Sequence, residues 1–262
     1  MRTALASLAL AAAITLPQIS VAQGLQFGGD TKLDFGAMSD EERAAFRNEV
    51  RSYLLENPDV IFEAIQILEQ RRALAGAEAD RQLVLNNAES IFADGHSWVG
   101  GNPDGDVTVV EFIDYRCGFC KRAHPEVAEM LERDPNIRLI VKEFPILGPD
   151  SVKAGKMALA ALDIAPDKYP DLSDELMEYR GNLTEQVAYQ IAGGLGFDIA
   201  ELKERANSVE IDDRLNSNYQ LAQALGLQGT PAFIVGTEII RGYLPVDDML
   251  GAVQEARATA QN

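Results

Sequence analysis

Two cysteines three positions apart are the strongest constraint on this 262-residue chain. Cys117 and Cys120 are its only cysteines, and they enclose Gly118 and Phe119. A disulfide stabilises a fold mainly by closing a long loop in the unfolded chain, so a pair this close can add little stability. The pair therefore indicates chemistry at sulfur rather than a structural cross-link.

The cysteines stand where an expected strand gives way to an expected helix. Residues 107–114 (VTVVEFID) have the apolar, β-branched character of a buried strand, and a helix is expected from about Cys117 to Arg133. The free amides of a helix N-terminus lower the pKa of a thiol placed there. Cys117 is therefore expected to be the exposed nucleophile, and Cys120 the more buried thiol that resolves a mixed disulfide.

A basic cluster follows the cysteines in an otherwise acidic chain of net charge −18. Lys121, Arg122 and His124 would add positive potential near the thiols, although solvated helix residues would give the same pattern. The overall acidity repels phosphate backbones, so no nucleic acid is expected as a partner.

Metal binding is a competing interpretation of the two thiols. A structural zinc site needs four ligands, and the only histidines, His96 and His124, do not supply a clear fourth beside the cysteines. Two soft thiolates suit Cu(I), so a copper-binding role stays open. Thiol–disulfide exchange itself requires no dissolved cofactor.

The N-terminal end predicts export. Residues 1–22 combine the basic Arg2 with an apolar run and the small residues Ser20 and Ala22, a pattern typical of a secretory signal cut after Ala22. An uncleaved anchor is the alternative, but the run is shorter than the ~20 residues that a membrane span needs. The predicted location is the periplasm of a bacterium.

A helical extension, assigned to residues 23–95, is expected before the redox-active part. Ser39 and Glu42 form a capping-box pattern, and apolar residues then recur at helical spacing, with a restart at Pro58. Such an apolar stripe must be buried somewhere. It predicts a stalk that forms a homo-oligomer through residues 39–75, and packing on the chain's own core is the alternative.

Residues 96–262 show an α/β pattern. After the strand and helix around the cysteines, we expect a second strand within residues 136–147, a mostly helical block at 151–225, a hairpin around Gly236 and Thr237, and a closing helix from Val246 to Ala258.

A resemblance to the DsbA-like branch of the thioredoxin superfamily is carried by VVEFIDYRCGFC and, much later, by GTPAFIVG. It covers about residues 106–258, and the block 151–225 corresponds to the helical insertion of that branch. It implies a thioredoxin fold and exchange with protein cysteines. It also implies a cis peptide bond between Thr230 and Pro231, where substrate backbone would pair; without the resemblance a trans bond would be expected.

The resemblance also gives Glu111 a role. In related proteins a carboxylate six residues before the first cysteine lies under the active site, and Glu111 has that position within an apolar strand. A buried carboxylate is costly unless it is paired or protonated. Glu111 would exchange a proton with Cys120, with Lys142 on the next strand as its partner; a solvated glutamate at a sheet edge is the alternative.

The two residues between the cysteines bear on the direction of electron flow. DsbA-type oxidases often carry Pro-His there, whereas Gly118 and Phe119, with Thr230 before Pro231, are more similar to the isomerase and reductase members of the ScsC type and to DsbC-like proteins. Several ScsC-type proteins have N-terminal helices that oligomerise. The sequence favours an exported disulfide isomerase or reductase over a dedicated oxidase, and a copper-binding or chaperone module is the alternative of another class. The expected partners are cysteine-containing exported proteins and a membrane redox partner.

Overall fold

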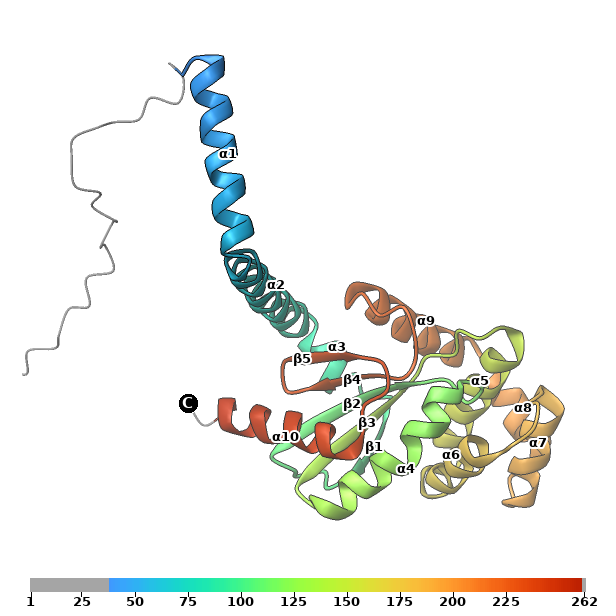
Figure 1. The fold of residues 1–262 in the computed structure, drawn as a ribbon. Helices are drawn as coiled ribbons and strands as arrows, with labels where there is room; N and C mark the ends of the chain where they lie inside the picture. The colour runs from blue at the N-terminus through green and yellow to red at the C-terminus, as the bar shows by residue number, and fades with distance from the viewer. Residues whose placement is uncertain (1–37, 261–262) are drawn as a thin grey trace, which may run out of the picture. The chain divides into compact units, whose positions relative to one another are not determined.

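The computed structural model describes residues 38–260, so the predicted signal at 1–22 lies outside the described residues. The chain divides into two compact units, with the boundary between Ala64 and Ile65. Figure 1 shows the elements of both units.

Helix α1 (Asp40–Glu56) belongs to the first unit and begins as the sequence predicts. Ser39 Oγ accepts a hydrogen bond from the amide of Glu42, and the Glu42 carboxylate accepts one from the amide of Ser39 at 2.8 Å. This reciprocal cap satisfies two amides that the helix itself leaves unpaired. The predicted restart at Pro58 is confirmed, because helix α2 (Asp59–Asn86) follows it directly.

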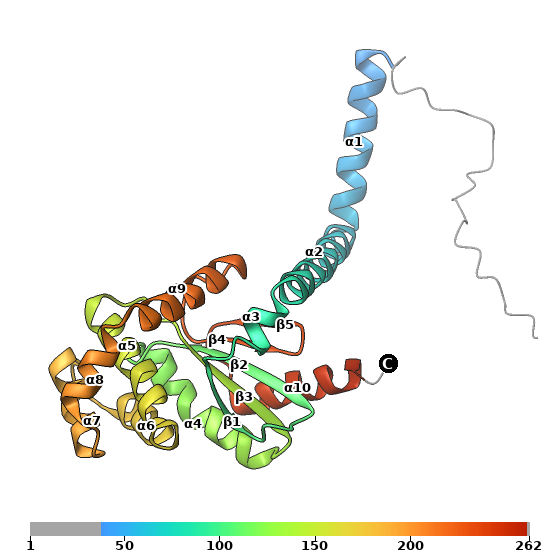
Figure 2. The ribbon, with the colours of Figure 1, turned by 180° about the vertical axis from the view of Figure 1, so that it is seen from behind.

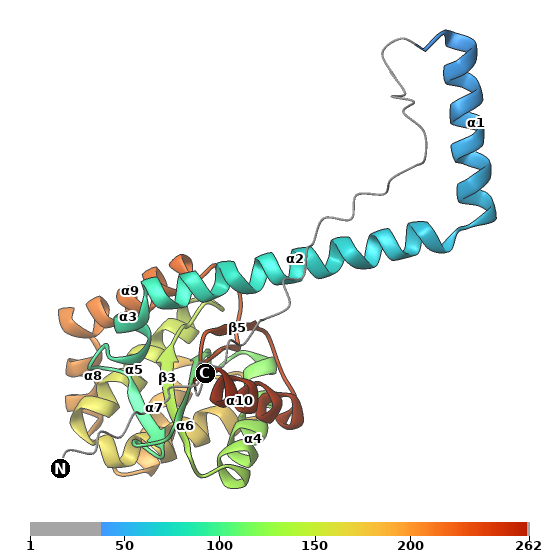
Figure 3. The same cartoon turned by 90° about the vertical axis from the view of Figure 1, so that its left-hand side faces the viewer.

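The last turns of α2 are part of the second unit. Val84 is buried together with Ile91 of helix α3 (Ala88–Phe92), against one face of the central sheet. Arg241 fixes the same stretch, because its guanidinium donates two hydrogen bonds to Asp80, at 2.7 and 2.8 Å. Figure 3 shows α2 leading into α3. This end of α2 therefore packs on the chain's own core, as the alternative prediction for the extension proposed.

The second unit is built on a five-stranded sheet in the order β1-β3-β2-β4-β5. Strands β2 and β3 are parallel, and the other neighbouring pairs are antiparallel. The expected hairpin is confirmed as β4 and β5, whose turn contains Gly236 at φ 59°. The strands are β1 (Trp98–Gly101), β2 (Val107–Ile113), β3 (Ile137–Glu143), β4 (Ala232–Val235) and β5 (Glu238–Arg241).

Helices cover both faces of this sheet (Figures 1 and 2). Helix α4 (Gly118–Arg133) and helix α10 (Val246–Ala260) bury side chains with Val109 and Ile113 of β2 on one face. The alternate β2 residue, Val110, lies on the other face with α3. This period of two is the ordinary geometry of a strand buried on both sides.

The predicted helical block is confirmed. Its described helices lie between β3 and β4. Most of their buried side chains join the core on the α4 face, whereas Leu221 and Ala222 of the last helix pack on the opposite face of the sheet. No helix in residues 38–260 is long and apolar enough to cross a membrane. The elements of the block are α5 (Pro149–Ile164), η1 (Pro166–Lys168), α6 (Tyr169–Glu178), α7 (Glu185–Gly194), α8 (Ile199–Ala206) and α9 (Val209–Ala224).

Candidate redox site

Cys117 is the N-cap of α4, with extended backbone angles that let its sulfur face the first amides of the helix. Its pKa is lowered to about 5, chiefly by a hydrogen bond from the Cys120 thiol, then by Thr230 and by the amides of Cys120 and Phe119, which together outweigh burial. As a thiol, Cys117 Sγ donates to the carbonyl oxygen of Thr230 at 3.1 Å. The prediction of a low pKa at this cysteine agrees with the structure.

Cys120 has the opposite environment. It is fully buried, and its pKa is raised because its proton bonds to Cys117 and because burial disfavours its thiolate. The expectation of an exposed Cys117 is wrong, since only 7% of that residue is accessible. The Thr230 loop covers the sulfur, while Phe119, between the two cysteines, is 60% exposed.

The peptide bond between Thr230 and Pro231 is cis, as the resemblance implies. The residues around it line a groove of about 430 Å³ that extends to Arg241 and Gly242 of the hairpin end. The hydroxyl of Thr230 is buried and has no hydrogen-bond partner in residues 38–260. It is therefore available to donate to a thiolate at Cys117.

Asp114 is a functional candidate that the sequence analysis missed. It is buried, and its carboxylate accepts hydrogen bonds from the amides of Arg116 (2.8 Å), Ile146 (2.8 Å) and Leu147 (2.9 Å) and from the Ser151 hydroxyl (2.9 Å). These bonds tie the segment before the cysteines to the loop after β3 and to the start of α5. An aspartate that bonds an amide two residues later is a recognised turn signal, but its distant partners have no local pattern.

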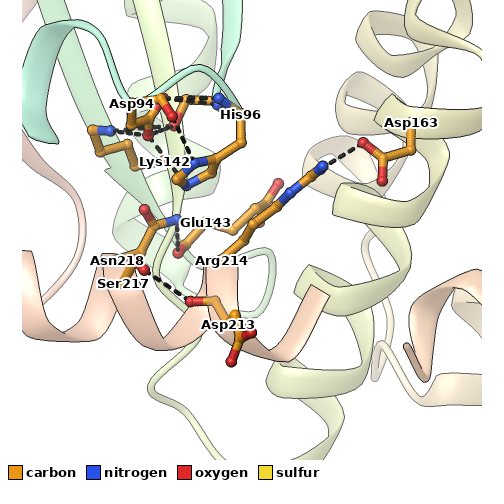
Figure 4. A network of polar contacts seen from close by, with 10 residues as sticks. Asp94, His96, Lys142, Glu143, Asp163, Asp213, Arg214, Ser217 and Asn218 are labelled. Carbon is orange, nitrogen blue, oxygen red and sulfur yellow. Dashed lines mark hydrogen bonds and ion pairs between the residues drawn. The ribbon is translucent and has the colours of Figure 1, made fainter. Parts of the chain in front are cut away.

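The predicted pair of Glu111 and Lys142 is wrong. In the parallel ladder Glu111 is opposite Val141, so the next residue of β3 points to the other face of the sheet. There the Lys142 ammonium donates hydrogen bonds to Asp94 at 2.5 Å and to Ser97 at 3.2 Å, as Figure 4 shows for Asp94. Lys142 therefore cannot reach the cysteine side, and its predicted support of the site is not available.

Glu111 itself lies on the cysteine side of the sheet and is only 6% exposed, so the alternative of a solvated edge residue is also wrong. Burial raises the pKa of its carboxyl to about 7, and the charge of His124 opposes that rise. The negative charge of Glu111 in turn contributes to the raised pKa of Cys120. The two groups are thus electrostatically coupled inside the core.

The basic cluster after the cysteines is engaged elsewhere. Lys121 Nζ donates to three backbone carbonyls at the end of α6, each at 2.9 Å, and the Arg122 guanidinium lies over the Tyr243 ring, 4.2 Å from its centroid. His124 Nε2 is 3.3 Å from the Asp174 carboxylate. The causes that lower the Cys117 pKa are hydrogen bonds. His124 acts on Glu111 instead.

This fold, with a CxxC pair at the start of α4, defines a protein of the thioredoxin fold. Comparison with protein families is in agreement: the DSBA-like thioredoxin domain matches residues 108–254, and the ScsC N-terminal domain of copper resistance proteins matches residues 42–75. Because the first match spans more than half of the chain, the protein belongs to the DsbA-like thioredoxin-domain family.

Several solved structures are similar to the chain. A thioredoxin-like oxidoreductase from Silicibacter pomeroyi DSS-3 is 39% identical, with a TM-score of 0.63, and the match covers 65% of this chain and 97% of that one. Salmonella enterica Typhimurium BcfH is 29% identical, with a TM-score of 0.67 and coverage of 83% and 96%. Proteus mirabilis ScsC in a transitional conformation is 26% identical, with a TM-score of 0.62 and coverage of 86% and 99%.

The curated relatives include larger proteins. The Na(+)/H(+) antiporter NhaA 3 of Salinispora tropica is 26% identical over 165 residues, which are 62% of this chain and 25% of the antiporter. The thiol:disulfide interchange protein DsbA of Bordetella pertussis is 28% identical over 155 residues, which are 57% of this chain and 73% of that protein. The chain thus spans about a quarter of the length of the antiporter that it matches.

Proposed function

We propose that this chain is an exported thiol–disulfide oxidoreductase that acts on protein disulfides and works as an isomerase or reductase. One observation carries the proposal: a Cys117 thiol with a pKa of about 5 lies beside a fully buried Cys120 of raised pKa. A thiolate is the nucleophile in disulfide exchange. This arrangement therefore supplies one reactive thiolate and one thiol that stays protonated until it resolves the mixed disulfide.

The reaction starts when the Cys117 thiolate attacks one sulfur of a substrate disulfide. The substrate S–S bond breaks, its other sulfur leaves as a thiolate, and a mixed disulfide forms. In isomerisation a second substrate thiolate attacks this intermediate and regenerates Cys117. In reduction Cys120 loses its proton to Glu111 and attacks Cys117, so the CGFC pair becomes the disulfide and the substrate leaves with two reduced sulfurs.

The surface around Cys117 suits an extended, partly apolar substrate segment. The backbone of Thr230 and Pro231 would pair with the substrate chain, and the groove beside them continues to Arg241. Phe119 lies between the two cysteines, and the Leu147 amide donates to Asp114 just before them; both side chains are exposed and apolar. Misfolded chains expose apolar segments, which supports protein substrates over small disulfides.

The residues between the cysteines support an isomerase or reductase over a dedicated oxidase. Gly118 and Phe119 stand where DsbA-type oxidases often carry Pro-His. The lowered pKa of the Cys117 thiol favours the reduced pair and so raises its reduction potential.

The extension supports self-association through residues 39–75. None of the residues of α1 is buried, and Val50 and Tyr53 expose apolar surface along it. The match to the ScsC N-terminal domain falls on residues 42–75. A second copy of the chain is the proposed occupant of this surface, because apolar stripes of this kind are buried by association.

Export to the periplasm, cysteine-containing exported proteins as substrates and a membrane redox partner complete the proposal. It is supported by the signal-like residues 1–22 and by the similarity to a periplasmic thioredoxin-like protein from Salmonella enterica serovar Typhimurium, which is 30% identical.

Two assays with the full chain test this function. Reduction of insulin by dithiothreitol and recovery of scrambled ribonuclease A should both accelerate with the wild-type protein. Cys117→Ser should abolish both effects, and Cys120→Ser should trap a mixed disulfide with substrate. The alkylation rate of Cys117 should rise with pH around a midpoint near 5. A wild-type protein without either activity would contradict the proposal.

Copper binding by the two thiolates is a second candidate, favoured by the description of the N-terminal match as part of a copper resistance protein. Two soft thiolates suit Cu(I). The discriminating variant replaces both Cys117 and Cys120 by serine. If this double variant retains full function in cells under copper stress, a role of the extension alone is favoured. If the double variant loses Cu(I) binding and the wild type shows no exchange activity, a copper module is favoured.

A further inference from the structure

A small cavity between β2, α4 and α6 gives the buried carboxylate of Glu111 a neighbour that can titrate. The cavity measures about 230 Å³, and its walls include Glu111 from β2, His124 from α4 and Asp174 from α6. Most of the remaining wall is apolar, and it includes Trp98, the only tryptophan of the chain. Glu111 and His124 therefore line the same cavity.

The three groups form a series of rising exposure. Glu111 is 6% exposed, the His124 side chain is 26% exposed, and the Asp174 side chain is 57% exposed. His124 Nε2 contacts Asp174 at 3.3 Å. His124 and Asp174 also line a larger and more open pocket of about 890 Å³ on the outer side. His124 thus borders both the inner cavity and the solvent-facing pocket.

Charged groups from each surrounding element act on this pair. The hydrogen bond and charge of Asp174 raise the pKa of His124, and Glu111 and Glu178 raise it further. Glu111 in turn interacts with the fully buried Cys120 and with Glu143 at the end of β3. His124 is the one cationic group among the causes that shift the Glu111 pKa.

We propose that His124, oriented by Asp174, is the positioning residue through which the proton of Glu111 passes between the core and solvent. The inference rests on the proposed exchange reaction. When Cys120 attacks Cys117, its proton moves to the Glu111 carboxylate, a Cys117–Cys120 bond forms and the bond from Cys117 to substrate breaks. The His124 imidazolium releases its proton to water beside Asp174, and the resulting neutral imidazole then takes up the proton from Glu111. No further oxidant is needed, because the substrate disulfide accepts the two electrons.

The chain carries its own control in a second histidine–aspartate pair. His96 Nε2 is 3.2 Å from Asp94, on the opposite face of the sheet, where Lys142 and not Glu111 is the neighbour of the aspartate. Figure 4 shows this pair. His124→Gln and His96→Gln each remove one partly buried imidazole from such a pair. The two substitutions are therefore chemically identical, but they lie on opposite faces of the sheet.

Stopped-flow fluorescence of Trp98 tests the inference, because this residue lines the cavity. The rate at which Cys120 resolves a preformed mixed disulfide should fall about tenfold in His124→Gln at pH 7 and should be unchanged in His96→Gln. The midpoint of its pH profile should move upward, because loss of the imidazolium raises the pKa of Glu111. Alkylation of Cys117 should be unaffected. His124→Ala should regain speed in imidazole buffer but not in an uncharged buffer of the same pH.

A titration of the two imidazoles by NMR gives a readout that needs no enzymatic activity. Glu111→Gln should lower the pKa of His124 and leave the His96 signal unchanged. Wild-type resolution kinetics in His124→Gln, an equal effect of His96→Gln, or a His124 titration insensitive to Glu111→Gln would each overturn the inference. Failure of the proposed function would instead appear as an inactive wild-type protein, in which the NMR coupling can still be measured.

Discussion

The two faces of the central sheet each bury a charged side chain near a histidine–aspartate pair, but they treat that charge differently. On one face Lys142 is fully buried and bonded to Asp94 and Ser97. On the other face Glu111 has no hydrogen bond or ion pair with any of residues 38–260, and it lines a cavity with His124.

Lys142 is thus part of a structural ion pair, whereas Glu111 is a group that can titrate. Asp94 compensates the buried ammonium of Lys142, and in turn the pKa of Asp94 is lowered to about 2, in part by that ammonium and by Ser97. Glu111, without such a partner, has a pKa of about 7 and can gain or lose a proton under physiological conditions. Unpaired buried carboxylates of this kind are typical of functional sites, whereas satisfied pairs contribute to the fold.

The largest expected effect is on the paired face. Asp94→Asn leaves the Lys142 ammonium buried without a counter-charge, and this should lower the free energy of unfolding by about 3–5 kcal/mol. Urea denaturation followed by circular dichroism measures the change. The double variant Asp94→Leu with Lys142→Met should recover most of the loss. A change below about 1 kcal/mol in the single variant would show that the pair is not structural.

The second prediction concerns stability against pH on the cysteine face. The pKa of Glu111 is raised from 4.5 to about 7 in the folded protein, so its contribution to stability is intact below pH 4.5 and is lost as the pH rises through 7. Glu111→Gln removes this penalty and should stabilise the protein by about 3 kcal/mol at pH 8 relative to pH 4. Denaturant titrations at both pH values measure it.

The same substitution should slow resolution by Cys120, so stability and reaction rate would move in opposite directions at Glu111. The exposed Glu132 of α4 is the control, because Glu132→Gln should change neither quantity. Equal stability gains at pH 4 and pH 8 would contradict the assignment of Glu111 as the unpaired group.

The smallest expected effect comes from Ser97→Ala. Its hydroxyl donates to Asp94 at 2.6 Å and accepts from Lys142 at 3.2 Å, so its loss should cost about 1 kcal/mol of unfolding free energy. The effect should be the same in the oxidised and reduced protein, as measured by thermal unfolding. A dependence on the redox state of the cysteines would mean that the two faces are coupled after all.

Local signals predicted the elements around the two cysteines well. The strand before Cys117, the helix that begins after it and the hairpin around Gly236 each have a pattern that a few neighbouring residues determine, and all three are confirmed. Strand β1, in contrast, consists of Trp98 to Gly101 and carries two glycines. Its strand geometry depends on pairing with β3, which no local pattern expresses.

The partner of Glu111 shows where local reasoning ends. The sequence places Lys142 on the strand next to Glu111, which makes it a plausible partner. Side chains alternate between the two faces of a sheet, however, and a shift of one residue in register reverses the face that each side chain occupies. The parallel register of β2 and β3 places Lys142 on the far side. His124 takes its place through the packing of α4, and Asp174 joins it from the insertion.

The sequence by itself determined the local setting of the candidate site: two thiols at the start of a helix and a buried strand before them. These features depend on short-range geometry and on the charge preference of helix ends. Only the tertiary structure decided that Thr230 covers Cys117 and that Glu111 is left unpaired behind it. Burial and pairing depend on which distant residues pack together, and that information resides in the register of the sheet and in the positions of its covering helices.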